Sequence, residues 1–348
     1  MYTKLYIYFM TKLLYIIVLI IALFFIVFYF FSKSEENASI TKSNDKDPEH
    51  DSLADEDRLF IRTGLKTNTS IHSIPIDEVL GGGPAKDGIP AILEPSFISL
   101  NEAKKIEKDD RQGVVVTVGN TTRFYPYSIL VWHEIVNDII EDTPVIVTFC
   151  PLCGSAIVFN PIVDGEKRTF GVSGKLWESN LLMYDKTNES LWSQILGKAV
   201  VGDDTGKSLE ILPSQLITFK EFANKYPNGE VLSRNTGEKR NYDFYPYGSY
   251  ESSDELYFPV SVSDTRLSSK EIMFIVNIDE YSGAFKRSDL LKVGSGELQV
   301  GNITVSAKVE GTEIKLTNKD TKEELAGYTA MWFSWAAHHQ ENGSVWSK

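Results

Sequence analysis

Cysteine and positive charge are both scarce in this chain of 348 residues. It has two cysteines, Cys150 and Cys153, and its formal net charge is −13. Proteins that bind nucleic acid use Lys and Arg to contact the phosphates, and no basic stripe with interleaved aromatic residues is present, so the sequence predicts no nucleic-acid partner. Hydrophobic residues make up 42% and charged residues 24% of the sequence, which is typical of a protein with a packed core.

One long apolar run stands near the N-terminus. Residues 13–31, LLYIIVLIIALFFIVFYFF, contain no charged side chain and would span roughly 28 Å as a helix, close to the thickness of the hydrocarbon core. The run ends in Phe31-Ser32-Lys33, which lacks the small residues of a cleavage site, and no cysteine follows for lipid attachment. The sequence therefore predicts an uncleaved signal anchor that crosses the membrane once.

Lysines stand both before and after the run, so the positive-inside rule does not decide the orientation of this segment. The orientation is predicted instead from the lengths of chain on either side. Residues 1–12 form a short tail, and a long body follows the segment. We expect the C-terminal domain to lie outside the cytoplasm. Residues 32–70 are predicted to be a flexible polar linker, because their start, 32–58, has no aromatic residue and is rich in Ser, Asn, Asp, Glu and Lys.

The body after this linker shows short runs of β-branched and aromatic residues separated by turn signals. Hairpins are predicted over 114–127, 181–194 and 198–212. Helices are few: one over 128–140, and one over 217–227 that begins with a Ser/Thr-x-x-Glu capping box. The predicted fold class is mainly β with a few helices (α+β).

The body also contains a weak internal repeat. Segment 217–232 matches 330–346, and the hairpin at 114–127 has a counterpart at 272–287. We predict two related β-meander units, 71–250 and a degenerate 251–348, although convergence of short β-meanders would produce the same pattern. The second unit lacks both cysteines, so a duplicated fold would not need them, which favours a chemical role for the pair.

A Cys-x-x-Cys pair has three possible uses. As a staple it closes a four-residue loop, which contributes about 2 kcal/mol, less than the roughly 3 kcal/mol of a fifteen-residue loop. As a redox site of thioredoxin type it needs a helix after the first cysteine, whereas residues 154–159 are predicted to turn into a strand. As a metal site, Cys-Pro-x-Cys-Gly has the form of a zinc-ribbon knuckle, and the remaining ligands must come from elsewhere.

His133 is the best additional ligand. On the predicted helix it lies four residues before Asn137 and so shares a face with it, and Glu134 continues the polar arc. Cys150, Cys153 and His133 are therefore the predicted metal ligands, for zinc or copper, with Glu134 and Asn137 behind them as orienting groups. The alternative is a histidine at the edge of the core that hydrogen-bonds the backbone.

Several strings together resemble a family known as domain of unknown function 3179: DGIPAI, WHEIVND, CPLCGSA, FGVSGKL and NLLMYDKTNESLWSQ. His133, Cys150 and Cys153 fall in its most characteristic strings. The resemblance implies an exported or membrane-anchored β-rich module and no established reaction. The C-terminal AMWFSWAAHHQENGSVW departs from the family, whose ending usually carries a proline at 339–341.

The sequence thus predicts a membrane-anchored, extracytoplasmic protein with a metal-binding or redox site at its cysteine pair. Two alternatives stay open, a non-catalytic ligand- or protein-binding ectodomain and a thiol-disulfide oxidoreductase. Whether the protein is an enzyme is also open, because the sequence assigns neither catalytic nor cofactor-binding residues.

Overall fold

The computed structural model describes residues 63–348. The described residues all belong to one compact unit. The predicted tail, the predicted membrane segment 13–31 and most of the predicted linker lie outside these residues. Within residues 63–348, no helix is both long and apolar enough to cross a bilayer.

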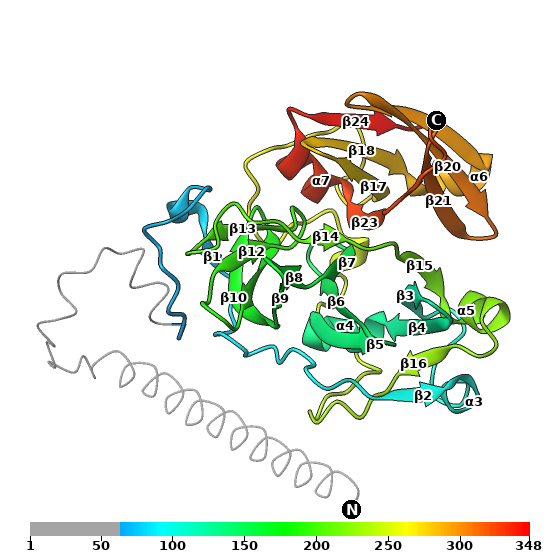
Figure 1. Cartoon of the computed structure of the whole chain (residues 1–348), viewed down its shortest axis with the longest axis horizontal. Coiled ribbons are helices and arrows are strands. Elements are labelled where there is room, and N and C mark those ends of the chain that lie inside the picture. The colour runs from blue at the N-terminus through cyan, green and yellow to red at the C-terminus, as the bar shows by residue number, and fades with distance from the viewer. Residues whose placement is uncertain (1–62) are drawn as a thin grey trace, which may run out of the picture. The chain divides into compact units, whose positions relative to one another are not determined.

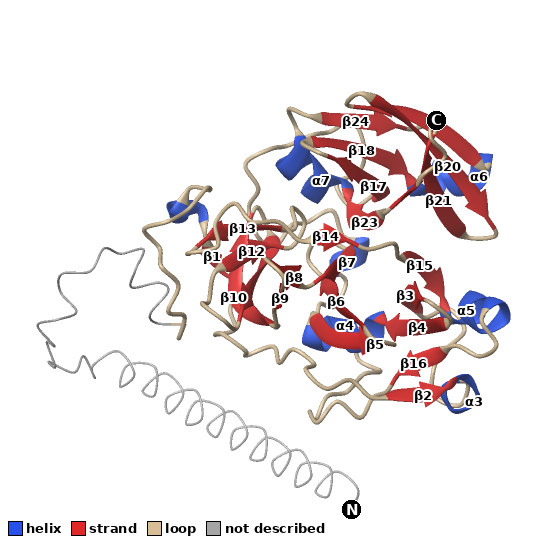
Figure 2. Ribbon diagram, in the orientation of Figure 1, coloured by secondary structure: helices blue, strands red, loops and turns tan. Residues whose placement is uncertain are grey.

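Strands dominate the described body and its helices are short (Figure 2), as the mainly β prediction required. The helices are α3 (Leu100–Ala103), α4 (Tyr127–His133), α5 (Phe219–Lys225), α6 (Arg287–Val293) and α7 (Trp332–His339), with the 3-10 turns η1 (Ile76–Glu78) and η2 (Tyr250–Ser252).

Within residues 63–348 the strands form five sheets. The first has the order β1 (Leu80–Gly81), β10 (Phe170–Trp177), β11 (Asn180–Asp185), β12 (Leu191–Ser193), β13 (Lys198–Val201). The second has the order β24 (Gly343–Trp346), β18 (Tyr281–Lys286), β17 (Ile272–Ile278), β23 (Tyr328–Met331), β7 (Ser155–Asn160), β6 (Thr143–Cys150), β5 (Ile135–Ile140), with β14 (Glu210–Ile211) also paired to β7. The third has the order β15 (Gln215–Thr218), β3 (Gln112–Val118), β4 (Thr121–Pro126), β16 (Glu230–Leu232), β2 (Phe97–Ser99). The smaller sheets are β19 (Ser295–Val300), β20 (Ile303–Glu310), β21 (Glu313–Asn318), β22 (Glu324–Leu325), and the pair β8 (Ile162–Val163), β9 (Glu166–Lys167).

One order of pairings occurs twice along the chain. In the first half, β3 and β4 form a hairpin, β15 adds antiparallel to β3, and β16 adds parallel to β4. In the second half, β17 and β18 form a hairpin, β23 adds antiparallel to β17, and β24 adds parallel to β18. A helix and three antiparallel strands follow each hairpin, as Figure 1 allows the reader to trace from cyan to red. An origin of the two halves by duplication stays a prediction.

The predicted helix over 128–140 is wrong in its second half. The helix α4 ends at His133, Glu134 takes a positive φ of 57°, and the chain continues as strand β5. The physical reason is the run of β-branched residues in IVNDII, which suits a pleated strand better than a helix.

Other local predictions can be compared directly with the structure. The hairpins 114–127 and 181–194 are present, and the Thr218–Glu221 capping box starts α5. The 198–212 hairpin is present near its turn, where Lys198 bridges Ser208 and the Ala199 amide donates to the Lys207 carbonyl at 2.9 Å, whereas its last residues, β14, pair with β7. The folded body also begins before the predicted boundary at Ile71: Leu65 is buried with 3% of its surface exposed.

The largest apolar cluster of the described residues combines side chains of the eight-stranded sheet with those of the β10–β13 sheet and contains both cysteines. Trp332 and Trp335 of α7 belong to the same cluster and are almost fully buried. A buried aromatic or large aliphatic side chain typically contributes about 1.5–3 kcal/mol, so the packing of α7 stabilises the surroundings of the cysteine pair.

Candidate functional site at the β6–β7 turn

Cys150 and Cys153 form the turn between β6 and β7. Cys150 pairs with Ser155 at the end of the ladder, and the Cys153 amide donates to the Cys150 carbonyl at 3.1 Å. Both side chains carry free thiols, and the Cys150 thiol donates to the Cys153 sulfur at a separation of 3.1 Å. A disulfide bond measures about 2.05 Å, so a movement of about 1 Å would join the two sulfurs.

The turn is sealed from solvent, since the exposed fractions are 1% for Cys150 and 0% for Cys153. Burial, together with the neighbouring Cys153 thiol, raises the pKa of Cys150 well above its ordinary value. A thiol in such surroundings stays protonated and is a poor nucleophile. In this closed form the pair is therefore a dithiol of low reactivity.

Glu134 places a carboxyl group beside Cys150. The residue is 7% exposed, and burial followed by the nearby Cys150 raises its pKa well above the ordinary value. Tyr247 hydrogen-bonds this carboxyl group. The Glu134 backbone takes φ 57° and ψ −33°, a sparsely populated region that costs on the order of 1–3 kcal/mol for a residue with a Cβ.

A second strained segment meets Cys153. The two-residue turn between β10 and β11 consists of Glu178 and Ser179, with φ of 49° and 60°. Such turns normally use Asn-Gly, so Glu-Ser is an unfavourable choice for the local backbone. The Ser179 carbonyl accepts a hydrogen bond from the Cys153 thiol at 3.1 Å. The strained turn therefore contacts the cysteine pair directly, through the Ser179 carbonyl.

A buried amide network holds the other side of Cys153. Asn180 donates from Nδ2 to the Cys153 sulfur at 3.4 Å and to Gln194 Oε1 at 3.0 Å. Gln194 Oε1 also accepts from Ser155 Oγ at 2.7 Å, and its Nε2 donates to Thr148 Oγ1 at 3.1 Å. The network ties both strands of the β6–β7 hairpin to the neighbouring sheet and keeps the sulfur in position.

A long connection between β16 and β17, residues 233–271, covers the site; we call it the strap. The Tyr250 hydroxyl donates to the Leu152 carbonyl at 2.8 Å, and the Ser261 amide donates to Glu178 Oε2 at 2.7 Å. Lys270 joins two parts of the strap, since its Nζ donates to the Glu255 carbonyl at 2.6 Å and lies over the Tyr250 ring. The strap therefore contacts both the cysteine turn and the neighbouring β10–β11 turn.

His133, a predicted ligand, has other partners. One ring nitrogen, Nδ1, lies 2.7 Å from the Pro90 carbonyl and the other, Nε2, lies 2.8 Å from the Tyr242 hydroxyl. Burial lowers its pKa. The structure thus places His133 in the role that the sequence analysis kept as its alternative, a core histidine hydrogen-bonded to the backbone.

Asn137 also serves the backbone. Its Oδ1 accepts from the Phe170 amide at 2.8 Å and its Nδ2 donates to the Phe170 carbonyl at 2.9 Å. The expectation that it steers His133 depended on a helix through both residues, and the change to a strand at Ile135 removes that shared face. Of the two predicted orienting groups, the structure brings only Glu134 to the cysteines.

The predicted metal ligands are not assembled. Over residues 63–348, no three His, Cys, Asp or Glu side chains are grouped so that they could hold a metal ion. Two thiols alone fall short of the three or four protein ligands that zinc sites use.

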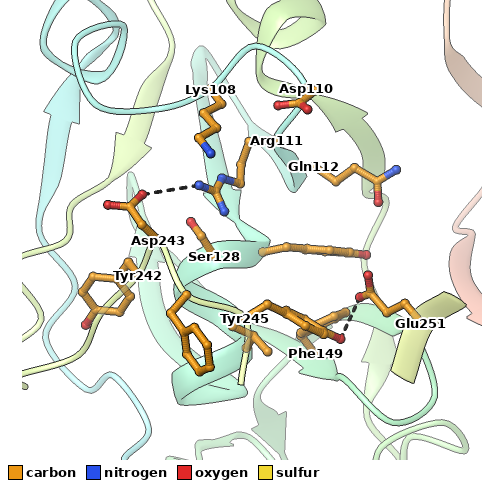
Figure 3. Close-up of a pocket in the computed structure, with 13 residues that line it drawn as sticks. Lys108, Asp110, Arg111, Gln112, Ser128, Phe149, Tyr242, Asp243, Tyr245 and Glu251 are labelled. Carbon is orange, nitrogen blue, oxygen red and sulfur yellow. Dashed lines mark hydrogen bonds and ion pairs between the residues drawn. The ribbon is translucent and has the colours of Figure 1, made fainter. Parts of the chain in front are cut away.

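The strap also forms one wall of a cavity of about 360 Å³ on the far side of β6 (Figure 3). Phe149, the residue before Cys150 on β6, also lines this cavity. The complete lining is Lys108, Asp110, Arg111, Gln112, Tyr127, Ser128, Val131, Phe149, Tyr242, Asp243, Phe244, Tyr245 and Glu251.

Sequence reasoning did not find the residues that surround the cysteines. Asn180 and Gln194 do carry a signal, because Asn180 directly precedes the apolar run LLMY, Gln194 directly precedes the apolar pair Ile195-Leu196, and each polar side chain is fully buried. Tyr247 and the cavity residues carry none, since the strap approaches the site only in the folded chain.

Comparison with curated proteins and with solved structures gave no match. A family model described as protein of unknown function (DUF3179) matches residues 86–322, more than half of the chain. The matched range includes the cysteine turn, Glu134, the Glu178–Ser179 turn and the strap. The chain therefore belongs to the DUF3179 family.

Proposed function

We propose that this is a single-pass, membrane-anchored, extracytoplasmic protein whose Cys150 and Cys153 interconvert between a dithiol and a disulfide. The observation that carries the proposal is the 3.1 Å separation of the two sulfurs on a tight turn. The apolar, uncharged run 13–31 supports the anchor, and an extracytoplasmic location would supply the oxidising conditions in which disulfides persist.

The exchange uses a disulfide of low-molecular-weight thiols, R–S–S–R, as its electron acceptor. The Cys150 sulfur attacks one sulfur of the acceptor, forms a mixed disulfide and releases one thiolate. The Cys153 sulfur then attacks Cys150 Sγ, which closes the protein disulfide and releases the second thiolate. Two electrons pass to the acceptor, and the two protons of the cysteines end on two molecules of RSH. We assign the first step to Cys150 because the Ser179 carbonyl and the Asn180 amide hold the Cys153 sulfur in place, where it can attack the mixed disulfide on Cys150 at a short distance.

Burial sets the direction of this couple. A low thiol pKa stabilises the reduced form and makes a disulfide oxidising, whereas burial raises the pKa of Cys150. The reduced form gains no such stabilisation here, so we expect a reducing couple, more negative than about −200 mV. The resting state outside the cytoplasm is then the disulfide.

A redox titration of the full chain tests the proposal. The protein is equilibrated in glutathione and dithiothreitol buffers of defined potential, the free thiols are blocked with a maleimide, and the products are weighed by mass spectrometry. We expect one two-electron transition. With oxidised glutathione, Cys153→Ser should retain a mixed disulfide on Cys150, and Cys150→Ser should retain much less. The absence of any transition between about −350 and −120 mV, or equal trapping by both variants, would overturn the redox proposal.

The same samples also distinguish the redox proposal from the alternative of a metal-binding site. Element analysis of protein purified without oxygen would show about one equivalent of zinc or copper, lost in Cys150→Ser, if the reduced pair binds a metal. The incomplete ligand set argues against this result.

A non-catalytic binding ectodomain is the second candidate, and the complete burial of both cysteines favours it. In that case the pair only closes the hairpin turn. A Cys150→Ser/Cys153→Ser double variant that keeps its stability and its ligand binding, in a protein that shows no redox transition, would support this candidate.

A further inference from the structure

The cavity of Figure 3 contains a buried hydroxyl group with no hydrogen-bond partner. Ser128 is 6% exposed, and its Oγ bonds to no other described residue. A buried hydroxyl without a partner costs free energy, and this one belongs to a residue that lines a cavity of about 360 Å³, a volume within the usual range of about 300–1,000 Å³ for small-molecule sites. An occupant with hydroxyl groups would supply the missing bond.

One side of the cavity is aromatic. Tyr127 stacks on Phe149 with ring centroids 4.1 Å apart and an angle of 29° between the rings. Phe149 is 1% exposed and therefore backs this stack, so the other parts of the Tyr127 ring face the cavity. Tyr245 and Phe244 extend the aromatic lining along the strap. Flat ring faces of this kind attract the partly positive C–H groups of a saturated ring through the aromatic quadrupole.

The arginine that lines the cavity is paired with carboxylates of the protein. Arg111 Nε lies 3.4 Å from Glu107 and Nη2 lies 3.6 Å from Asp243, and Arg234 also pairs with both of these carboxylates. The Glu251 carboxylate accepts a hydrogen bond from the Tyr245 hydroxyl at 2.9 Å. These arrangements leave no uncompensated cationic cluster for an anionic ligand.

Donors and acceptors are instead distributed around the cavity. In Figure 3, Lys108 and Ser128 lie on the side of Arg111, and Gln112 and Glu251 lie on the opposite side. Lys and the Gln amide donate, carboxylates accept, and a serine hydroxyl does both. A neutral molecule whose own groups both donate and accept fits this mixture better than an anion, a cation or an apolar molecule.

We propose that the cavity is a carbohydrate-binding site that takes a neutral sugar unit. The sugar ring lies with its C–H face against the Tyr127 and Tyr245 side, and its hydroxyls bond to Ser128, Gln112 and the carboxylate of Asp110. This site is separate from the cysteine pair and does not depend on the redox proposal.

A glycan array followed by calorimetry tests the site. The full chain is kept in a zwitterionic detergent without sugar groups, labelled, and applied to an array of neutral and acidic glycans. The strongest neutral glycan is then titrated by isothermal calorimetry into wild type, Gln112→Ala, Ser128→Ala and Asp110→Asn. Since one hydrogen bond contributes about 1 kcal/mol net, each variant should bind about fivefold more weakly.

The matched control is Gln299→Ala, which removes an exposed amide from β19 in the other half of the body and should bind as wild type does. Gln112 is exposed and Ser128 Oγ has no partner to lose, so these variants should fold normally. The proposal is overturned if no neutral glycan binds, if acidic glycans bind in preference, or if all three cavity variants bind like the control.

Discussion

Replacing Glu134 with glutamine should make the protein more stable at neutral pH. The carboxyl group is buried beside Cys150, and burial raises its pKa in the folded state, whereas an unfolded glutamate has a pKa of about 4.3. A raised folded pKa contributes stability that is fully present below about pH 4.3 and is lost as the pH rises towards the folded value. Glutamine has nearly the same shape as the protonated acid and does not ionise, so the variant does not lose this stability as the pH rises.

The magnitude follows from the linkage relation. While the group is neutral in the folded state and ionised in the unfolded state, each pH unit costs about 1.36 kcal/mol. From pH 5 to pH 7 the advantage of Glu134→Gln over wild type should therefore grow, and about 2.7 kcal/mol is the upper bound of this growth.

Urea unfolding of the reduced full chain at pH 5, 6 and 7, followed by tryptophan fluorescence, measures this difference. Taking the difference between the two proteins cancels the titration of the groups that they share. The exposed Glu94→Gln is the control and should show a flat difference. A flat difference for Glu134→Gln as well would mean that the carboxylate is ionised and hydrated in the folded protein, and the burial argument would be refuted.

Three further substitutions test the fold around the site. His133→Ala removes a fully buried ring with two hydrogen bonds and should lower the free energy of unfolding by about 2–4 kcal/mol. The redox potential of the cysteine pair should not change. If His133 were a metal ligand, the substitution would instead lower the metal content of the protein. Thr218→Ala removes the capping box of α5 and should cost about 1 kcal/mol in the same assay. Gly174→Ala introduces a Cβ 2.1 Å from the Pro84 carbonyl oxygen at a φ of +73° and should lower the free energy of unfolding by at least about 2 kcal/mol. An unchanged denaturation midpoint in any of the three variants would contradict the structural role given to that residue.

Much of the local structure follows from patterns within ten or so residues. The hairpin at 114–127 and the helix after Thr218 are present as predicted, because turn chemistry and capping act between near neighbours in sequence. The prediction of one helix over 128–140 was wrong because the local pattern there is ambiguous. Its apolar positions suit a helix and a strand almost equally, and the β-branched residues favoured a strand after His133.

The site was predictable only in part. The cysteine turn and Glu134 stand within one stretch of sequence, and the structure brings them together. His133 belongs to the same stretch, yet Tyr242 of the strap and the Pro90 carbonyl occupy its ring nitrogens. No spacing rule relates these partners to His133, since they lie 43 and 109 positions away.

The sequence by itself determined the local elements, the tight cysteine pair and the membership of a family defined by its strings, because these depend on chemistry between neighbouring residues. Only the tertiary structure decided what surrounds the sulfurs: the strained Glu178–Ser179 turn, the amide of Asn180 and the covering strap. Burial in a shared core brings such distant segments together, and burial is also what raises the pKa values of Cys150 and Glu134.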